Sequence, residues 1–409
     1  MQCRSCRHET YHVVVDLLTS PVANAFIAPE EVGLAEPFFP LKVLVCDRCF
    51  LVQLEESRSV DQIFNKDYVY FSSFNEPFVR HAERYVATLV EDFGLDGSSF
   101  VVEAASNDGY LLQFVKRRGI RCLGIEPSGS TANAAMEKGI DTLVDFFSEE
   151  LAHKAVAERG KADVFIGNNV LAHVPDMNAF VAGIGVMLAD EGVAVLEFPH
   201  LLNLVRERQF DTVYHEHFSY LSLIAASAAF ERHGMFIFRV DEQPVHGGSL
   251  RMYAAKQSSA RPVEESYERV LSAEKESKLD SLAGFSGIQK DVDQTCIAFM
   301  KFLVEARAAG STVVGYGAAA KGNTFLNYCG VKPYLMEACV DLTPAKQGKL
   351  LPGSRIPVYD EHLLSRLKPE YIVILPWNWA DDIRVRLAYT SQWDAKLVTA
   401  IPKLSIVPA

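Results

Sequence analysis

The 409-residue sequence lacks several features that would assign it to a membrane or nucleic-acid-binding class. It has no apolar run of about 18 residues, so no membrane-spanning helix is expected. Residues 1–6 have no apolar signal core, and we therefore expect a cytoplasmic protein. Basic residues are scarce relative to acidic ones, and the formal net charge of −12 argues against broad contact with nucleic acid. A phosphorylated ligand stays compatible with this charge, because local basic residues and helix N-termini can bind it.

The composition that remains is typical of a large soluble globular protein. Apolar residues make up 49% of the chain and charged residues 22%. A chain of this length is too long for one ordinary core, so two or three domains are expected.

Four of the eight cysteines form two Cys-x-x-Cys pairs, Cys3 with Cys6 and Cys46 with Cys49. Two such pairs can supply the four thiolates of a tetrahedral Zn²⁺ site. Four thiolates close the coordination shell, so a structural role is expected. The alternatives are unpaired thiols, redox pairs or a nucleic-acid-binding finger, the last disfavoured by the acidic balance. The other cysteines are interpreted as buried thiols: Cys122, Cys296, Cys329 and Cys339.

Two connecting segments are predicted to be helical. Residues 76–93 carry apolar side chains at helical spacing. The cluster of Tyr68, Tyr70 and Ser73 precedes them, and it suits either a ligand site or an ordinary N-cap region. Residues 259–309 are charged as well as helical in pattern, and we interpret them as a linker whose charged face is solvated.

Residues 99–255 alternate between short apolar strands and helices, which predicts a parallel sheet covered on both faces. The first two strands each end in a carboxylate, Glu103 and Glu126. Sheets of this kind bind their ligands at the carboxyl ends of the strands. The two acids therefore mark a predicted ligand site.

The turn after the first strand indicates the kind of ligand. Glu126 follows Gly109 by roughly the 20 residues that place an acid on a ribose diol. The turn over residues 104–109 contains a single glycine, too few for close approach to a pyrophosphate. A ligand with a ribose and no pyrophosphate, such as S-adenosylmethionine, is predicted. The alternative is a generic doubly wound domain whose acids are incidental.

Residues 310–409 predict a second α/β unit. Within it, Gly315-x-Gly317-x-x-Ala320 is a variant of the dinucleotide-binding fingerprint. Lys321 follows at the expected helix start, where it could meet a phosphate. This unit could bind the phosphates of a nucleotide, bind a nicotinamide cofactor, or be purely architectural.

Residues 212–220 hold two phenols, two imidazoles and a carboxylate. Tyr214, Glu216 and His217 suit acid–base catalysis. His215 and His217 would lie on one face of a strand, where they could instead bind a metal ion. A satisfied polar pair at a strand end is a third interpretation. The α/β units on either side favour acid–base chemistry in a cleft between two ligands.

Together the motifs resemble the sugar C-methyltransferases that act on nucleotide-linked keto-deoxysugars. The similarity extends over nearly the whole chain, and the combination is specific where each single motif is not. The motifs are the two Cys-x-x-Cys pairs, Tyr68-x-Tyr70-x-Ser-Ser73, Asn107-Asp-Gly109, Gly124-Ile-Glu-Pro-Ser128, Asp145-Phe-Phe147, Asn168-Asn-Val-Leu-Ala-His173, Tyr214-x-Glu216-His217, Pro244-Val-His-Gly-Gly248, Gly315-Tyr-Gly317 with Lys321, Asp341-x-Thr-Pro-x-Lys346-Gln347 and Trp377-Asn378.

The resemblance implies four parts: a zinc-binding module over residues 1–60, a Rossmann-like S-adenosylmethionine domain over 61–258, a helical linker over 259–309, and a Rossmann-like nucleotide-sugar-binding lobe over 310–409. It implies S-adenosylmethionine and structural Zn²⁺ as cofactors. The residues implied to bind the cofactor are Tyr70, Ser73, Glu103, Ser106, Asn107, Asp108, Glu126, Pro127, Ser128, Asp145, Phe146 and Asn168. The residues implied to bind the substrate are His246, Gly247, Tyr316, Gly317, Lys321, Asn323, Asp341, Thr343, Lys346, Trp377 and Asn378.

Two positions depart from the family pattern. The turn Glu103-Ala-Ala-Ser106 has no glycine where one is usual, so backbone approach to the cofactor is expected to differ slightly. His215 stands where an acid is expected. It adds an imidazole and bears on sugar specificity rather than on the reaction class.

The resemblance assigns the catalytic centre to Tyr68, His173, Tyr214, Glu216 and His217. C-methylation needs a carbon nucleophile, and a hydrogen beside a ketone is acidic enough for a side-chain base to remove. We hypothesise that neutral His217 removes it, while Glu216 or Tyr214 orients the site or stabilises the enolate. His173 would act as a donor or proton relay; a helix-cap or core histidine is the alternative.

The expected substrate is a dTDP- or GDP-linked keto-deoxysugar, methylated at C3 of a 4-keto sugar. His246, which precedes two glycines, is expected to shape the substrate cleft as a turn residue. We expect a monomer or small homo-oligomer with no nucleic-acid or membrane partner. The alternative functions are an S-adenosylmethionine-dependent O- or N-methyltransferase, a nicotinamide-dependent sugar oxidoreductase or epimerase, and a zinc-module binding protein without catalysis.

Overall fold

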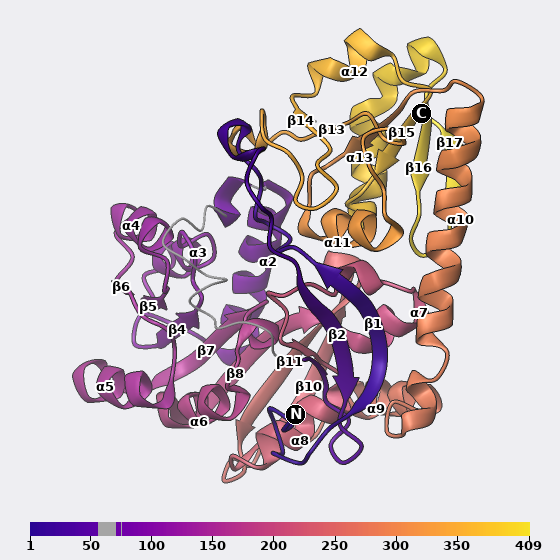
Figure 1. Cartoon of the computed structure of the whole chain (residues 1–409). Helices are drawn as coiled ribbons and strands as arrows, with labels where there is room; N and C mark the ends of the chain where they lie inside the picture. Colours follow the sequence, from indigo (N-terminus) through magenta and orange to yellow (C-terminus); the bar gives the residue numbers. More distant parts are fainter. Residues whose placement is uncertain (56–70, 75) are drawn as a thin grey trace.

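The computed structural model describes residues 1–55, 71–74 and 76–409, and it contains three β-sheets with helices packed around them (Figure 1). The predicted α/β class is therefore confirmed. The predicted site residues Tyr68 and Tyr70 lie outside the described residues. In the described part of the chain, no helix is long and apolar enough to cross a membrane.

The largest sheet has seven strands in the order β10-β11-β8-β7-β4-β5-β6. β4 to β8 run parallel, whereas β11 pairs antiparallel with both β8 and β10. The carboxyl ends of the parallel strands meet at one edge, where doubly wound sheets bind their ligands. The strands are β4 (Phe100–Ala104), β5 (Arg121–Ile125), β6 (Thr142–Leu143), β7 (Ala162–Asn168), β8 (Leu188–Pro199), β10 (Met235–Gln243) and β11 (Ser249–Lys256).

Helix α2 (Glu76–Phe93) has the bounds predicted from its apolar spacing. Phe78, Tyr85 and Leu89 recur along one face of the helix and are buried against the seven-stranded sheet and α3 (Leu112–Arg117). The other helices around this sheet are α4 (Gly129–Glu137), α5 (Glu149–Arg159), α6 (Met177–Met187) and α8 (Leu223–Glu231). Helix α7 (Leu201–Arg206) instead packs into the core that the N-terminal sheet shares with the C-terminal lobe.

The N-terminal sheet is completed by a strand from the middle of the chain. β1 (His12–Ser20), β2 (Phe39–Val45) and β3 (Val52–Leu54) form an antiparallel meander. β9 (Ser219–Tyr220) then pairs antiparallel with β3. Because His217 lies two residues before β9, the N-terminal sheet continues directly into the predicted catalytic stretch.

The segment between β1 and β2, residues 21–38, extends to the C-terminal lobe (Figure 1). We call it the strap. Ile27 and Leu350 exchange two backbone hydrogen bonds of 3.0 and 2.9 Å. Arg355 donates from its guanidinium to the carbonyl of Val32 at 2.9 Å. The strap therefore joins the N-terminal sheet to the C-terminal lobe.

The C-terminal lobe contains a six-stranded sheet in the order β14-β13-β12-β15-β16-β17, with only β16 and β17 antiparallel. Its strands are β12 (Val313–Tyr316), β13 (Ala338–Val340), β14 (Val358–Tyr359), β15 (Tyr371–Ile374), β16 (Lys396–Thr399) and β17 (Ser405–Pro408). Its helices are α11 (Ala320–Cys329), α12 (His362–Leu367) and α13 (Ala380–Arg386).

The charged segment 259–309 is helical as predicted, forming α9 (Glu265–Glu276) and α10 (Ile288–Ala308). The expectation that its charges are all solvated is wrong at Glu274, whose side chain is fully buried. Its carboxylate accepts from the backbone N–H groups of Leu223 and Ile224 at 2.6 and 2.9 Å. It also lies 2.7 Å from His200 Nε2. The donors at the N-terminus of α8 and the imidazole compensate the burial of the charge.

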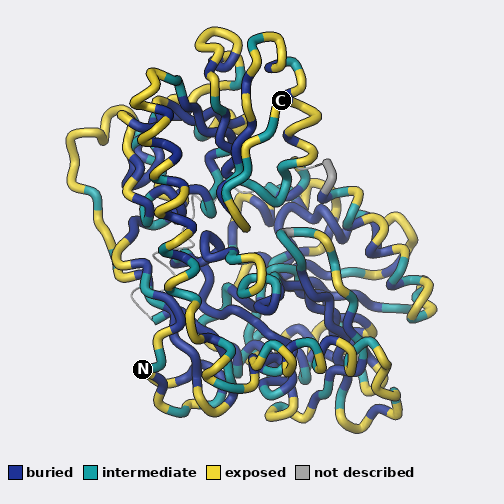
Figure 2. The backbone as a smooth tube through the Cα atoms, turned by 90° about the vertical axis from the view of Figure 1, so that its right-hand side faces the viewer, coloured by how far each residue is buried: buried dark blue, intermediate teal, exposed yellow. Residues whose placement is uncertain are grey.

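One apolar core runs through four parts of the chain. It includes Val43 of the N-terminal sheet, Phe210 of residues 210–220, here called the middle segment, Phe299 of α10 and Phe325 of α11, all at most 3% exposed. Figure 2 shows buried backbone through the middle of the molecule and exposed backbone around its periphery. Because these parts share a core, the N-terminal sheet and the C-terminal lobe hold the middle segment between them.

Candidate active site and metal centre

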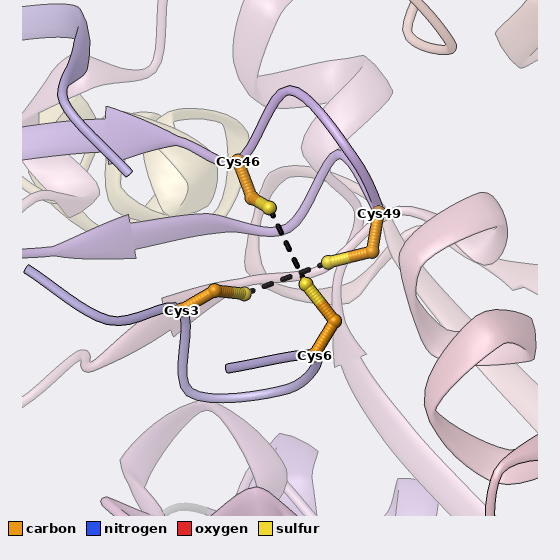
Figure 3. Close-up of side chains that lie close together, drawn as sticks. All are labelled: Cys3, Cys6, Cys46 and Cys49. Atoms are coloured by element: carbon orange, nitrogen blue, oxygen red, sulfur yellow. Dashed lines mark hydrogen bonds between the residues drawn. The ribbon is translucent and has the colours of Figure 1, made fainter. Parts of the chain in front are cut away.

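The four predicted metal ligands converge on one point (Figure 3). Cys3 Sγ lies 3.5 Å from Cys49 Sγ, and Cys6 Sγ lies 3.5 Å from Cys46 Sγ. All four sulfur atoms are within 4.8 Å of one another. A disulfide would need about 2.05 Å, whereas four thiolates at about 2.3 Å from Zn²⁺ place their sulfur atoms about 3.8 Å apart.

The two cysteine pairs are presented by equivalent turns. Arg7 and Phe50 each lie four residues after the first cysteine of a pair, with φ of 60° and 55°. The N–H of Arg7 donates to the carbonyl of Cys3 at 3.0 Å, and that of Phe50 donates to Cys46 at 2.9 Å. These turns aim both thiols of each pair inward, so the cluster fits a tetrahedral Zn²⁺.

Glu126 directly follows β5 at the carboxyl edge of the central sheet. Its two carboxylate oxygens accept the backbone N–H groups of Asn107 and Ser128, each at 2.9 Å. Burial raises the pKa of Glu126, and these two hydrogen bonds oppose the rise. The acid therefore joins the turn after β4 to the start of α4, and Pro127 lies between its two contacts.

Glu103 is buried at the end of β4, and its carboxyl oxygens have no hydrogen-bond partner among the described residues. Burial raises the pKa of Glu103 well above its usual value. Asn168, at the end of β7, also has a buried side-chain oxygen without a described partner. Two neighbouring strands thus end in polar groups suited to a polar ligand.

The other predicted cofactor residues lie around the same edge. Lys138 donates to the side chains of Ser73 and Asp108, at 2.8 and 3.2 Å. Asp145 and Phe146 are exposed on the loop after β6. The remaining member of this set, Ser106, is buried in the turn after β4.

The predicted catalytic stretch forms a cluster of aromatic rings. The ring centroids of Tyr214 and His217 are 4.0 Å apart, and those of His173 and His217 are 4.7 Å apart. His173 lies on the short helical turn Leu171–His173 after β7, so it enters from the cofactor edge of the central sheet. The structure therefore brings together residues that lie far apart in the sequence.

Hydrogen bonds fix the tautomers of both imidazoles. His217 Nδ1 lies 2.7 Å from the carbonyl oxygen of Thr212, and His173 Nδ1 lies 2.7 Å from that of Glu216. A carbonyl only accepts, so Nδ1 carries the proton in each ring, and the basic lone pair of the neutral ring is on Nε2. Burial lowers the pKa of His173 to about 4. His173 is therefore neutral near pH 7.

Glu216 is 5% exposed, and burial raises its pKa to about 7. Asn24 of the strap donates from Nδ2 to Glu216 Oε1 at 2.7 Å. Sequence reasoning missed Asn24. The only sequence signal was that the chain between the cysteine pairs is longer than a compact zinc site needs.

His215 is 1% exposed, and its contacts do not support a metal-binding role. Its Nε2 lies 3.1 Å from the carbonyl oxygen of Pro40, at the start of β2. Among the described residues, the Cys3 to Cys49 cluster is the group with metal-ligand geometry. His215 and His217 contact different parts of the chain, which argues against a shared metal ion.

In the C-terminal lobe, Lys321 and Trp377 adjoin the middle segment. Lys321 Nζ lies 4.9 Å from the Trp377 ring centroid, and Trp377 donates its indole N–H to Asp211 at 2.7 Å. Burial lowers the pKa of Lys321, and the charge of Asp211 opposes that shift. Asp211 was not predicted, because nothing in its local sequence indicates a contact with residues so far along the chain.

Glycine is required at two predicted substrate positions. Gly247 has φ of 87°, and a Cβ there would lie 2.7 Å from the Trp377 ring. Gly317 has φ of 84°, and a Cβ there would lie 2.6 Å from Pro376. Both glycines therefore let the turn Trp377–Trp379, which includes Asn378, approach closely.

Asp341 follows β13 and organises the turn after β12. Its carboxylate accepts the backbone N–H of Ala318 at 2.7 Å and of Thr343 at 2.8 Å. Lys346 Nζ lies 3.3 Å from Asp341 Oδ2. Tyr316 donates to Glu361 at 3.1 Å. Asn323 is buried on α11, where Asn323 Nδ2 donates to the carbonyl of Ala23 in the strap at 2.6 Å.

Families of known proteins match the N-terminal, central and C-terminal parts of the chain. Family models match residues 3–64 as a zinc binding domain, residues 78–237 as a methyltransferase domain and residues 244–402 as a C-methyltransferase C-terminal domain. The chain is 31% identical to the C-methyltransferase NovU of Streptomyces niveus over 408 residues, covering 100% of this chain and 97% of that protein. The domain matches and the cysteine cluster support the predicted cofactors, S-adenosylmethionine and Zn²⁺.

Two solved structures are similar to part of this chain. They are magnesium protoporphyrin IX methyltransferase from Synechocystis PCC 6803 with bound SAH and with bound SAM. They are 18% and 17% identical to this chain, cover 44% and 49% of it and 83% and 99% of their own chains, and have TM-scores of 0.36 and 0.37.

Proposed function

The chain belongs to the C-methyltransferase family, and we propose that it methylates the carbon beside the ketone of a nucleotide-linked keto-deoxysugar. The methyl donor is S-adenosylmethionine, which supplies an electrophilic methyl group when bound. The proposal assigns the methylation to C3 of a 4-keto sugar carried by dTDP or GDP.

The observation that carries the proposal is the hydrogen bond from His217 Nδ1 to the carbonyl of Thr212. It makes Nε2 the basic nitrogen of a ring that lies between Tyr214 and His173. A carbon acid beside a ketone needs such a base, whereas methylation of a hydroxyl oxygen is less demanding. Together with the C-methyltransferase matches, this favours carbon over oxygen as the methylated atom.

In the proposed reaction His217 Nε2 takes the proton, and the electron pair of the broken C–H bond moves toward the ketone oxygen. Tyr214 stabilises the enolate oxygen as a hydrogen-bond donor, Glu216 orients the site, and neutral His173 lies on the side of the cofactor edge. The enolate carbon would then bond to the methyl group as the methyl–sulfur bond breaks, and S-adenosylhomocysteine would leave. That step needs alignment of the reacting atoms rather than further acid or base. Tyr68, which lies outside the described residues, is assigned to the proposed centre on the basis of the sequence alone.

The cofactor is proposed to bind at the carboxyl edge of the central sheet. Buried polar oxygens of Glu103 and Asn168 without described partners fit its polar groups. Glu126 stands at the position of a ribose-binding acid. Around them, the proposal places Tyr70, Ser73, Ser106, Asn107, Asp108, Pro127, Ser128, Asp145 and Phe146.

The nucleotide of the substrate is proposed to bind the C-terminal lobe at the turn after β12. Lys321 at the start of α11 suits a phosphate. We also propose that the zinc-binding module ends at residue 60, the S-adenosylmethionine domain at 258 and the linker at 309. The protein is further proposed to be cytoplasmic and to form a monomer or a small homo-oligomer. The nicotinamide-dependent alternative finds no support in the matched families.

Proton exchange tests the proposal. The protein, S-adenosylhomocysteine and a dTDP- or GDP-linked 4-keto-deoxysugar are incubated in D₂O, and the hydrogen beside the ketone is followed by NMR. Wild type should exchange it, and His217→Asn should slow the exchange by at least about a hundredfold. Cofactor binding by calorimetry controls for folding of the variant. Absence of exchange with every keto-sugar nucleotide would overturn the proposal.

A further inference from the structure

The strap brings a side chain of the N-terminal module into the candidate active site. Asn24 Nδ2 donates to Glu216 Oε1 at 2.7 Å. Among the residues that the structure describes, Asn24 is the side chain that donates a hydrogen bond to that carboxylate. Glu216 is 5% exposed, whereas Asn24 is exposed. The amide therefore lies between a buried carboxylate and open space.

Both partners are held by neighbouring residues of one helix. Asn323 of α11 donates to the carbonyl of Ala23, the residue before Asn24, at 2.6 Å. Thr324 donates to the carbonyl of Val213, the residue before Tyr214, at 3.0 Å. One turn of α11 therefore fixes the strap and the catalytic stretch relative to each other.

The strap is also held on the far side of Asn24. Ile27 forms a two-bond bridge with Leu350, and the ring of Phe26 lies 5.7 Å from Lys346 Nζ. With Ala23 fixed by α11, the chain is anchored on both sides of Asn24. These contacts on both sides hold the backbone at Asn24 in place, so its exposed side chain stays directed toward Glu216.

We propose that Asn24 is a positioning residue that orients the Glu216 carboxylate, so that the zinc-binding module forms one wall of the catalytic centre. This inference rests on the proposed function. A buried carboxylate with a single described donor depends on that donor for its rotamer and for the stability of its ionised form. The backbone carbonyl of Glu216 accepts from His173 at 2.7 Å, so displacement of Glu216 would disturb His173 as well.

Asn24→Ala and Asn24→Asp test the proposal, with Glu30→Gln as the matched control on the exposed part of the strap. Asn24→Asp keeps the shape and replaces the donor with an acceptor. The readouts are kcat and KM for the exchange reaction, its pH profile, zinc content and affinity for S-adenosylhomocysteine. Among the described residues, the titratable groups of the same cluster are His173, which contacts the Glu216 carbonyl, His217, which packs against His173, and Tyr214, which packs against His217; all of them stay in place.

The expected result is a fall in kcat of about tenfold to a hundredfold in both variants, the range for a lost charge-assisted hydrogen bond. KM, zinc content and cofactor affinity should stay near wild type. In Asn24→Ala the loss of the donor raises the pKa of Glu216 further, so the limb of the profile that Glu216 controls should move to higher pH. A merely structural role would not move that limb.

Two outcomes would overturn the positioning role: a wild-type kcat and pH profile in Asn24→Ala, or an equal loss in Glu30→Gln. In either case the proposed function would still be supported if wild type exchanged the proton and His217→Asn did not. If wild type shows no exchange at all, the proposed function has failed, and the inference about Asn24 falls with it.

Discussion

Trp377 of the C-terminal lobe donates its indole N–H to the carboxylate of Asp211 in the middle segment, at 2.7 Å. The same carboxylate opposes the loss of charge on Lys321, whose ammonium lies over the Trp377 ring. Three residues from distant parts of the chain thus form one unit where the proposed nucleotide site meets the proposed catalytic centre.

Asp211→Ala should therefore weaken nucleotide binding. Without the carboxylate, burial favours a neutral Lys321, and the Trp377 ring loses its anchor. The affinity for dTDP or GDP should fall about tenfold, as expected for one lost charge-assisted contact. Titration calorimetry measures this. Lys403→Gln, an exposed lysine of the same lobe, is the control and should bind like wild type. Equal affinity in Asp211→Ala and wild type would refute the role.

Glu274→Ala should destabilise the protein strongly. It leaves buried His200 and the backbone N–H groups of Leu223 and Ile224 without their acceptor. Removing one member of a buried pair costs about 3–5 kcal/mol. Thermal unfolding measures the loss. The control is Glu276→Ala, an exposed acid on the same helix, which should unfold near the wild-type temperature. Matching transitions in the two variants would contradict the account of α9.

Zinc removal should lower activity, because the cysteine cluster supports the strands next to the catalytic stretch. Cys49 precedes β3, and β3 pairs with β9 two residues after His217. Cys3→Ser should lose about one equivalent of zinc, the single site expected for four thiolates. It should also lower proton exchange. Cys122→Ser, outside the cluster, is the control. Full exchange in a zinc-free variant would show that the module does not support the catalytic stretch.

The rate of proton exchange should change near pH 7 as Glu216 titrates, because burial raises the pKa of Glu216 to about 7. We call this part of the pH profile the Glu216 limb. His173 cannot supply this limb, since its pKa is lowered to about 4. If ionised Glu216 is the working form, the exchange rate rises through that pH, and Glu216→Gln removes the rise. Persistence of the limb in Glu216→Gln would assign it to another group.

The contribution of Glu216 to folding stability should fall over the pH range in which the exchange rate rises. A carboxyl with a folded pKa above its unfolded value of about 4.3 binds more protons when folded, so its contribution to stability falls as pH rises toward 7. Glu216→Gln should therefore gain thermal stability relative to wild type at pH 8, with little gain at pH 4. The absence of that difference would show that the burial of Glu216 is not costly.

Local patterns allowed much of this arrangement to be predicted. Cysteine spacing predicted the metal cluster, and helical spacing predicted the bounds of α2. The carboxyl ends of the first two strands predicted where Glu103 and Glu126 would lie. Each of these rests on residues close in sequence or on a rule for one type of element, so no knowledge of packing between domains was needed.

Contacts between distant segments could not be predicted in the same way. Asn24 with Glu216, and Asp211 with Trp377, are each separated by more than 150 residues. Asn and Asp are common in turns, so neither residue stands out locally. The buried Glu274 lies in a charged run that resembles any solvated helix. In each case the partner decides the role, and the partner is known only once the chain is folded.

The position of the new methyl group tests the central claim most directly. The protein is given S-adenosylmethionine labelled with ¹³C in its methyl group together with a dTDP- or GDP-linked 4-keto-deoxysugar, and the product is analysed by NMR. The account predicts a labelled methyl bonded to the carbon beside the ketone, formed by wild type and at least about a hundredfold more slowly by His217→Asn. A labelled methyl on oxygen or nitrogen, or undiminished transfer by His217→Asn, would contradict it.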